Sequence, residues 1–254
     1  MSTRLLAMLG MAAAVAACTD GTGPGSARTV SLTFSTAANG APLLSRMGVE
    51  DDTLISGSDV LVITSAQVVL REIELKRDDD DACDRRGQSD DDDCEEFEIG
   101  PMLVDLPLGG ATETVLTIPI DTGTYDEIEF EVHKPEDDGA AADQAFVAQH
   151  PDFDRVSIRV EGTWNGTPFV FTTDLNVEQE IDLVPPLVVT EGTGTNVTLR
   201  VDLDRWFRNQ SGALVDPASA NQGGQNENLV KDNIKDSFEA FEDEDRDGDD
   251  RDED

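Results

Sequence analysis

Residues 155–173 have the sequence RVSIRVEGTWNGTPFVFTT, in which apolar and polar side chains alternate on both sides of an Asn-Gly pair. A period of two is typical of a strand that turns one face to a core and the other to water. Asn165 and Gly166 favour a two-residue hairpin, because both residue types tolerate a positive φ. This stretch therefore predicts two neighbouring antiparallel strands.

The same alternation recurs along residues 28–207. Strands are expected at residues 30–34, 60–63, 66–75, 102–106, 115–120, 127–133, 155–161, 169–173, 177–183 and 197–204. Within the third of these the inward parity changes, which indicates a β-bulge near Arg71 and Glu72. Because short strands follow one another without helical periodicity between them, we expect an all-β fold: an antiparallel β-sandwich of the immunoglobulin or transthyretin type.

One helix is expected after the sandwich. Its apolar stripe would consist of Val230, Ile234, Phe238 and Phe241. Residues 208–241 are accordingly interpreted as a loop followed by this C-terminal amphipathic helix. The acidic residues 242–254 are expected to form a disordered tail.

The first residues resemble a bacterial lipoprotein signal peptide. In residues 1–17 a positive start precedes about a dozen apolar residues, which fits an export signal and is too short for a stable transmembrane helix. Small residues precede Cys18 as in a lipobox, so we expect Cys18 to be lipidated; an ordinary secretory signal is the alternative. Residues 18–27 have the composition of a flexible tether. Thr19 is not the aspartate typical of inner-membrane retention, which favours the outer membrane or cell surface of a bacterial envelope.

The chain is strongly acidic. It has 55 acidic and 18 basic residues and a formal net charge of -37, so nucleic acid is excluded as a partner because its phosphates would be repelled. Much of this charge lies in residues 78–96, an insertion between two expected strands, and in residues 242–254. The folded protein therefore has to accommodate strong repulsion between like charges in both segments.

Two cysteines flank the centre of the acidic insertion. In an oxidising compartment Cys83 and Cys94 are expected to form a disulfide. The bridge would hold Asp90, Asp91, Asp92 and Asp93 close together, and crowded carboxylates favour calcium. A solvated charge run is the alternative, so this cluster is the weaker of two calcium candidates.

The stronger calcium candidate lies near the C-terminus. Residues 243–248, DEDRDG, match the first half of an EF-hand-like loop, in which alternate aspartates face one cation and glycine permits the sharp turn. The candidate ligands are Asp243, Asp245, Asp247 and Asp249. A merely solvated tail is the alternative.

The sequence gives little support for an enzyme. His133 falls on an outward strand position and His150 in an acidic, alanine-rich segment, so both are interpreted as surface residues rather than general bases. Trp164, Trp206, Phe169, Phe171 and Phe207 are interpreted as core, with a sugar-stacking platform as the alternative. No catalytic residue is therefore assigned.

Part of the chain resembles a known family. Asp105-Leu106-Pro107-Leu108, Gly123-Thr124-Tyr125 and Ile128-Glu129-Phe130 are similar to the strand, turn and strand core of bacterial lipoproteins in domain of unknown function family 4382. Residues 195–207 are similar to that family's closing strand. The resemblance covers roughly residues 28–207 and implies a β-sandwich lipoprotein, with no activity to carry over. The acidic insertion and the C-terminal segment depart from the family pattern.

These observations together predict a location and a broad role. We expect a lipid-anchored envelope or surface protein, calcium-responsive, with a noncatalytic binding or structural role. Its partners would be the membrane, through the N-terminal lipid, and an envelope protein or glycan. The alternative is a carboxylate-dependent surface hydrolase that acts on polysaccharide.

Overall fold

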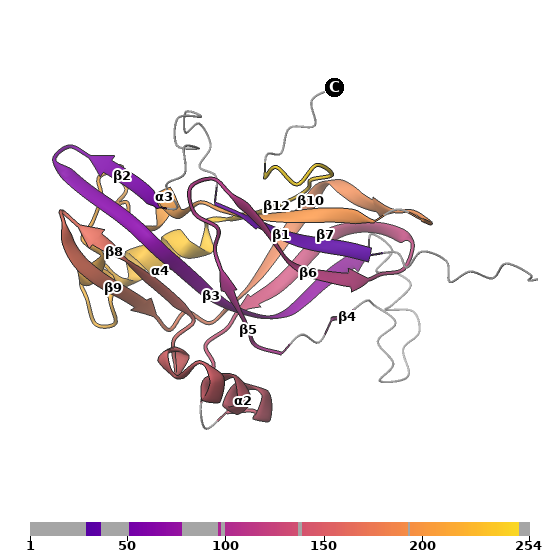
Figure 1. The fold of residues 1–254 in the computed structure, drawn as a ribbon, viewed down its shortest axis with the longest axis horizontal. Coiled ribbons are helices and arrows are strands. Elements are labelled where there is room, and N and C mark those ends of the chain that lie inside the picture. Colours follow the sequence, from indigo (N-terminus) through magenta and orange to yellow (C-terminus); the bar gives the residue numbers. More distant parts are fainter. Residues whose placement is uncertain are drawn as a thin grey trace, which may run out of the picture.

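The computed structural model of this chain is mostly β and describes residues 29–36, 51–77, 96–97, 100–136, 139–192 and 194–248 (Figure 1). Two sheets form a β-sandwich-like fold. The four-stranded sheet has the order β12-β11-β1-β6, with bounds β1 Thr29–Ser35, β6 Thr112–Pro119, β11 Thr195–Val201 and β12 Phe238–Glu242. The all-β prediction is confirmed.

The eight-stranded sheet is built around one long strand. Its main path is β10-β7-β3-β8-β9, and β2, β4 and β5 also pair with β3. The bounds are β2 Asp52–Ser56, β3 Asp59–Arg77, β4 Glu96–Phe97, β5 Met102–Asp105, β7 Gly123–Val132, β8 Ile158–Trp164, β9 Thr167–Thr173 and β10 Val177–Val189. All its described pairs are antiparallel. In the other sheet β1 pairs in parallel with β11, so the expectation of a purely antiparallel sandwich is wrong at this pair.

The local features expected along the strands are present. Asn165 and Gly166 connect β8 to β9 with φ values of 50° and 78°, as a type I′ hairpin requires. The register between β3 and β7 shifts between Arg71 and Glu74, and Glu72 has a φ of 51°. The predicted hairpin and bulge are both confirmed.

The core lies between the two sheets. Inward-facing residues of β1 (Val30, Leu32 and Phe34) pack in this core. The rings of Phe130 and Phe238 meet edge to face across it, with their centroids 5.4 Å apart. The aromatic residues considered for sugar stacking belong mostly to this core. Trp206, Phe171 and Phe207 are fully buried, Phe169 is 9% exposed, and Trp164 packs at the margin.

The C-terminal helix is shorter than predicted. Helix α4 spans Glu227–Lys235 and buries Val230 and Ile234, but Phe238 and Phe241 lie on β12, which pairs with β11. Two hydrogen bonds hold the intervening turn: Trp206 Nε1 donates to Ser237 Oγ at 2.8 Å, and the Asp202 amide donates to the Ser237 carbonyl at 3.0 Å. The helix ends at Lys235, because the residues that follow form backbone hydrogen bonds with strand β11.

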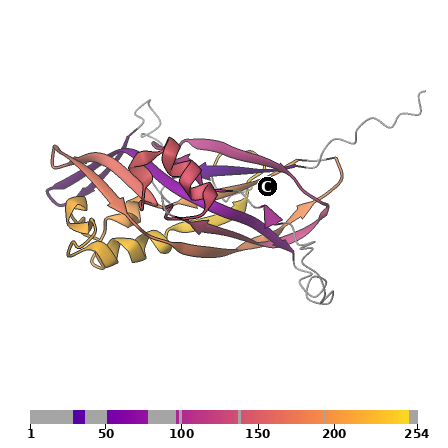
Figure 2. The same ribbon diagram turned by 90° about the horizontal axis from the view of Figure 1, so that it is seen from below.

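Four short elements were not expected from the sequence. Helix α2 (Ala141–Gln149) and a 3-10 turn (Pro151–Phe153) cover one face of the eight-stranded sheet, where Phe146 and Phe153 pack on Val69. Helix α3 (Leu203–Trp206) follows β11, and a second 3-10 turn (Pro217–Ala220) lies in the loop before α4. Figure 2 shows α2 on the outside of the sandwich and α4 at one end. Among the described residues, we find no helix with the length and apolarity needed to span a bilayer.

Candidate metal centre

Residues 243–248, here named the strap, follow β12 and lie against the outer face of the four-stranded sheet. The acidic segment was expected to be disordered, but up to Gly248 it makes specific contacts. The Asp243 amide donates to the Asn196 carbonyl at 3.1 Å, and Asn196 Nδ2 returns a bond to the Asp243 carbonyl at 3.0 Å. Asn196 is itself positioned by Thr33, whose Oγ1 donates to Asn196 Oδ1 at 2.7 Å. The strap therefore begins as a continuation of the sheet.

Asp243 is the anchor of this loop. It is only 2% exposed, which is unusual for an aspartate. Its Oδ2 accepts hydrogen bonds from Thr198 Oγ1 at 2.7 Å and from the Gly248 amide at 3.0 Å. Its Oδ1 is buried and accepts no hydrogen bond from an N–H or hydroxyl group of the described residues. One carboxylate oxygen is thus held by hydrogen bonds from the protein, and the other remains able to bind a cation.

Two further aspartates lie beside the Asp243 carboxylate. Asp243, Asp245 and Asp247 each present a carboxylate oxygen within 4.8 Å of the others. The Asp247 amide donates to Asp245 Oδ1 at 3.4 Å, which curls the loop around this point. The Asp245 carboxyl is close enough to share a proton with the Asp243 carboxylate, and this hydrogen bond raises the pKa of Asp245 most, with burial and the charge of Asp247 adding smaller effects. Like charges are therefore crowded here.

Gly248 completes the turn. Its φ is +82°, which L-residues rarely adopt, and a Cβ at this position would lie 2.9 Å from both Ser35 Cβ and Thr112 Cγ2. Glycine is required here for conformation and for close approach to the sheet. The turn brings the Gly248 amide back to Asp243, so the loop closes on its own first aspartate.

The donor set of the loop fits a hard cation. Carboxylate oxygens in a flexible loop favour calcium, which accepts six to eight oxygens, whereas zinc prefers nitrogen and sulfur ligands. The three aspartates stand at alternate positions before a glycine, and the structure brings them together. Asp249, the fourth predicted ligand, lies outside the described residues.

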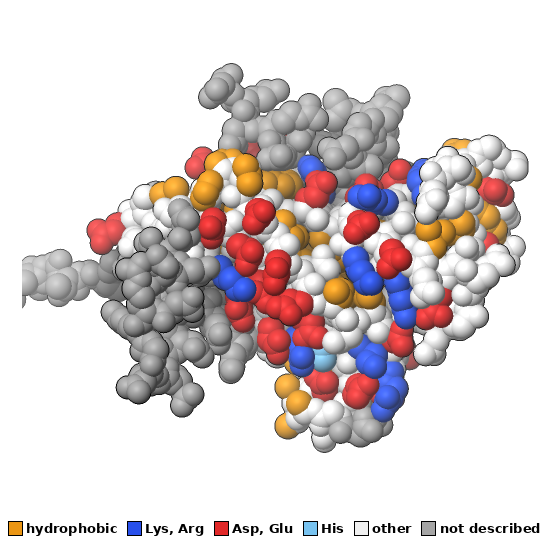
Figure 3. Space-filling model, turned by 180° about the vertical axis from the view of Figure 1, so that it is seen from behind, with side chains coloured by type: hydrophobic (Ala, Val, Ile, Leu, Met, Phe, Trp, Pro, Cys, Tyr) orange, Lys and Arg blue, Asp and Glu red, His pale blue; other side chains and the backbone are white. Residues whose placement is uncertain are grey.

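A second acidic cluster lies on the exposed face of the eight-stranded sheet (Figure 3). Glu129, Glu178 and Glu180 also present oxygens within 4.8 Å of one another. Here, however, Lys76 forms ion pairs with Glu129 and, at 3.5 Å, with Glu127. These contacts raise the pKa of Lys76, the hydrogen bond to Glu129 contributing most. The protein supplies the counterion of this cluster itself.

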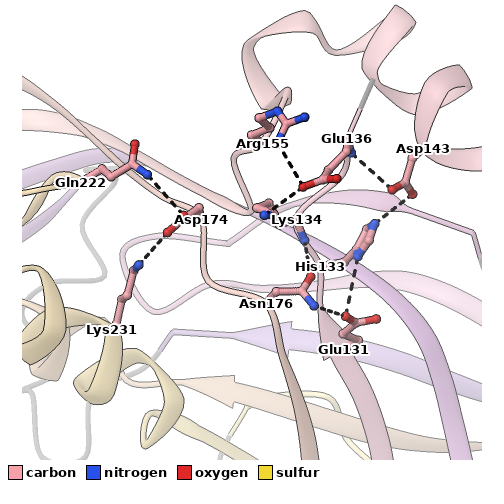
Figure 4. Close-up of polar contacts among 10 residues, drawn as sticks. All are labelled: Glu131, His133, Lys134, Glu136, Asp143, Arg155, Asp174, Asn176, Gln222 and Lys231. Carbon is pink, nitrogen blue, oxygen red and sulfur yellow. Dashed lines mark hydrogen bonds and ion pairs between the residues drawn. The ribbon is translucent and has the colours of Figure 1, made fainter. Parts of the chain in front are cut away.

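His133 is not the surface residue that the strand pattern indicated. It is 4% exposed, and its Nε2 lies 2.9 Å from Oδ1 of Asp143 on α2 (Figure 4). Its Nδ1 lies 3.8 Å from Glu131 Oε1. The prediction was wrong because α2, which the sequence pattern did not indicate, covers the end of β7.

The contacts around His133 are those of a structural tether. Asn176 Nδ2 donates to Glu131 Oε1 at 2.7 Å, and Asn176 Oδ1 accepts from the Lys134 amide at 2.9 Å (Figure 4). Asp143 Oδ2 accepts from the Glu136 amide at 3.3 Å. These bonds join α2 to the loops at one end of the eight-stranded sheet. His150 is half-buried at the end of α2, where its ring packs on Phe146 at 4.7 Å.

Several predicted site residues lie outside the described part of the chain. They are the lipidation candidate Cys18, the disulfide candidates Cys83 and Cys94, and the weaker calcium cluster of Asp90, Asp91, Asp92 and Asp93. These assignments stay predictions. Thr198 and Asn196, which dock Asp243, were not singled out from the sequence, since they look like ordinary outward strand residues.

Comparison with family models, curated proteins and solved structures found no match to this chain. The resemblance to domain of unknown function family 4382 therefore stays a prediction.

Proposed function

We propose that this protein is a lipid-anchored, calcium-responsive β-sandwich of the bacterial cell envelope, with a noncatalytic binding or structural role. The observation that carries the calcium assignment is the buried Oδ1 of Asp243, which accepts no hydrogen bond from a described N–H or hydroxyl group and lies in a loop with two more clustered aspartates. The N-terminal signal pattern and Cys18 support the envelope assignment.

A buried carboxylate needs compensation for its lost hydration. An unsatisfied buried polar group costs about 1 to 3 kcal/mol, and more when it is charged. In the described part of the chain no cationic side chain forms an ion pair with Asp243. A cation held between Asp243, Asp245 and Asp247 would supply the missing partner and relieve the repulsion between them.

Calcium is the cation that this loop suits best. Its coordination is flexible, whereas magnesium demands near-ideal octahedral geometry and gives up its water reluctantly. A loop with only half of an EF-hand pattern should bind weakly, with a dissociation constant of about 0.1 to 1 mM, typical of extracellular modules. Such an affinity suits an exported protein, because it would respond to extracellular rather than cytosolic calcium.

The test is calorimetric titration of the full exported chain with calcium chloride. We expect saturable heat for the wild type and its loss in a variant with Asp245→Asn and Asp247→Asn, which keeps side-chain size. The matched control carries Glu178→Gln and Glu180→Gln in the second acidic cluster and should retain the wild-type heat. Equal heats for wild type and the aspartate variant would overturn the calcium assignment.

The binding role is tested separately. A pull-down from solubilised envelope in calcium and in chelator should recover an envelope protein or glycan that depends on calcium. A glycan-hydrolysis screen of the same protein addresses the alternative, a carboxylate-dependent surface hydrolase. Turnover together with a calcium-insensitive melt would favour that alternative and reject our proposal.

A further inference from the structure

We infer that calcium bound at Asp243 holds the strap against the four-stranded sheet, and we call this arrangement the clamp. Thr198 and Thr112 act as positioning residues on two different strands. This inference rests on the proposed calcium site and adds its regulation. The clamp would hold β12 and β6, the two edge strands, to the same short segment.

The strap contacts the strands of the sheet in their spatial order. It leaves β12 at Glu242 and is fixed to β11 through the bonds from Asn196 and Thr198 to Asp243. Its Arg246 then reaches β1, where Nη2 donates to Ser31 Oγ at 3.3 Å, and β6, where Thr112 Oγ1 donates to the Arg246 carbonyl at 3.0 Å. In Figure 1 this yellow segment runs alongside the sheet.

The surface beneath the strap is suited to close contact. The inward residues of β1 are large and apolar, but Ser31, Thr33 and Ser35 face the opposite way and are at most 5% exposed. Small hydroxyl side chains let the backbone of Gly248 approach so closely that a Cβ there would lie only 2.9 Å from Ser35 Cβ. Ser31 Oγ also accepts a hydrogen bond from Arg246 of the strap.

The docked conformation is the one that needs a cation. Docking places Asp243 in a buried position next to Asp245 and Asp247, where its Oδ1 accepts no hydrogen bond from a described N–H or hydroxyl group. A cation bound there stabilises the docked strap, whereas a detached strap would leave the carboxylates hydrated and apart. A ligand that prefers one conformation shifts the population toward it. Calcium binding and docking must therefore be coupled, and the coupling is reciprocal.

Reciprocity gives a test that removes no metal ligand. Thr112→Val deletes the hydrogen bond from β6 to the Arg246 carbonyl at nearly constant volume. If docking and binding are coupled, this variant should weaken calcium affinity about fivefold, as expected for loss of one hydrogen bond. Thr163→Val, a matched substitution on β8 of the other sheet, should leave the affinity unchanged. Circular dichroism would first establish that both variants retain the wild-type fold.

Limited trypsin digestion of the wild-type chain tests docking directly. Mass spectrometry would follow cleavage after Arg246, which we expect calcium to slow at least tenfold relative to chelator. The Asp245→Asn, Asp247→Asn variant should be cut equally fast in both conditions.

The outcomes separate the clamp from the calcium site. Saturable calcium binding with unchanged affinity in Thr112→Val, or with calcium-independent cleavage after Arg246, would overturn the clamp and leave the proposed function standing. Absence of calcium heat in the wild type would overturn the proposed function, and the clamp with it.

Discussion

Two clusters of three carboxylates lie on opposite sheets of this molecule, and they differ in what balances their charge. In the strap cluster Asp243 is buried and no described lysine or arginine pairs with it. On the eight-stranded sheet, Glu178 and Glu180 are exposed, and Lys76 contacts Glu129. Crowding of acidic residues therefore does not by itself make a metal site. Burial without an internal counterion is what calls for an external cation.

The largest expected effect concerns calcium and the strap cluster. At a calcium concentration one hundred times the dissociation constant, binding should raise the free energy of unfolding by about 2.7 kcal/mol. Urea unfolding in calcium and in chelator would measure the difference. The variant with Asp245→Asn and Asp247→Asn should show none. A wild type that is equally stable in both conditions would remove the distinction between the two clusters.

The next largest effect concerns the hydrogen bond from Thr198 to Asp243. Thr198→Val removes the 2.7 Å hydrogen bond to Asp243 Oδ2 while keeping side-chain volume. Because hydrogen bonds to charged groups contribute about 1.5 to 3 kcal/mol, we expect a stability loss of about 2 kcal/mol in urea unfolding. Thr172→Val on β9 serves as the comparison variant. A loss no greater than that of the comparison variant would show that the strap is not anchored through this residue.

A third substitution should make the second cluster behave like the first. Lys76→Met removes the counterion of Glu129 and Glu127. Since Lys76 is about one third exposed, solvent screening limits the expected loss of stability to about 1 kcal/mol. The variant should also gain stability from calcium beyond the wild-type gain, and this gain should persist when Asp245→Asn and Asp247→Asn are added. No additional gain would mean that an exposed cluster cannot recruit a cation even without its lysine.

The smallest expected effect is a pH dependence in the second cluster. The neighbouring Glu129 carboxylate, by hydrogen bonding and by charge, raises the pKa of Glu178 from 4.5 to about 7. A raised carboxyl pKa means that the folded state binds protons more tightly, so stability is lost as pH rises from about 4.5 through about 7. Urea unfolding across this range should show a shallower decline for Glu178→Gln than for wild type. An identical pH profile would contradict the proximity of these two carboxylates.

Local sequence patterns predicted the features that depend on neighbouring residues. Asn165-Gly166 specifies its hairpin because positive φ at two successive positions is a property of those residue types. The parity change at Arg71 and Glu72 located the bulge for a similar reason, since alternation reports directly which face each side chain takes.

Predictions failed where distant contacts decide the structure. Phe238 fits the helical spacing of Val230 and Ile234, yet pairing with β11 places it on a strand. His133 fits an outward strand position, yet α2 covers it and Asp143 binds its ring. In each case the partner segment is remote in sequence or lacks a periodic signal of its own, so no local pattern could indicate it.

The strand-rich fold, the hairpin, the bulge and the alternate aspartates before Gly248 could all be predicted from the sequence, because side-chain period and backbone preference are local properties. Contacts between distant segments determine which acidic residues are paired with a described lysine and which carboxylate is buried without one. That outcome depends on Thr198 and Asn196 burying Asp243 against one sheet and on Lys76 reaching Glu129 on the other. The charge balance of each cluster depends on which residues lie next to it in space, and the tertiary fold determines those residues.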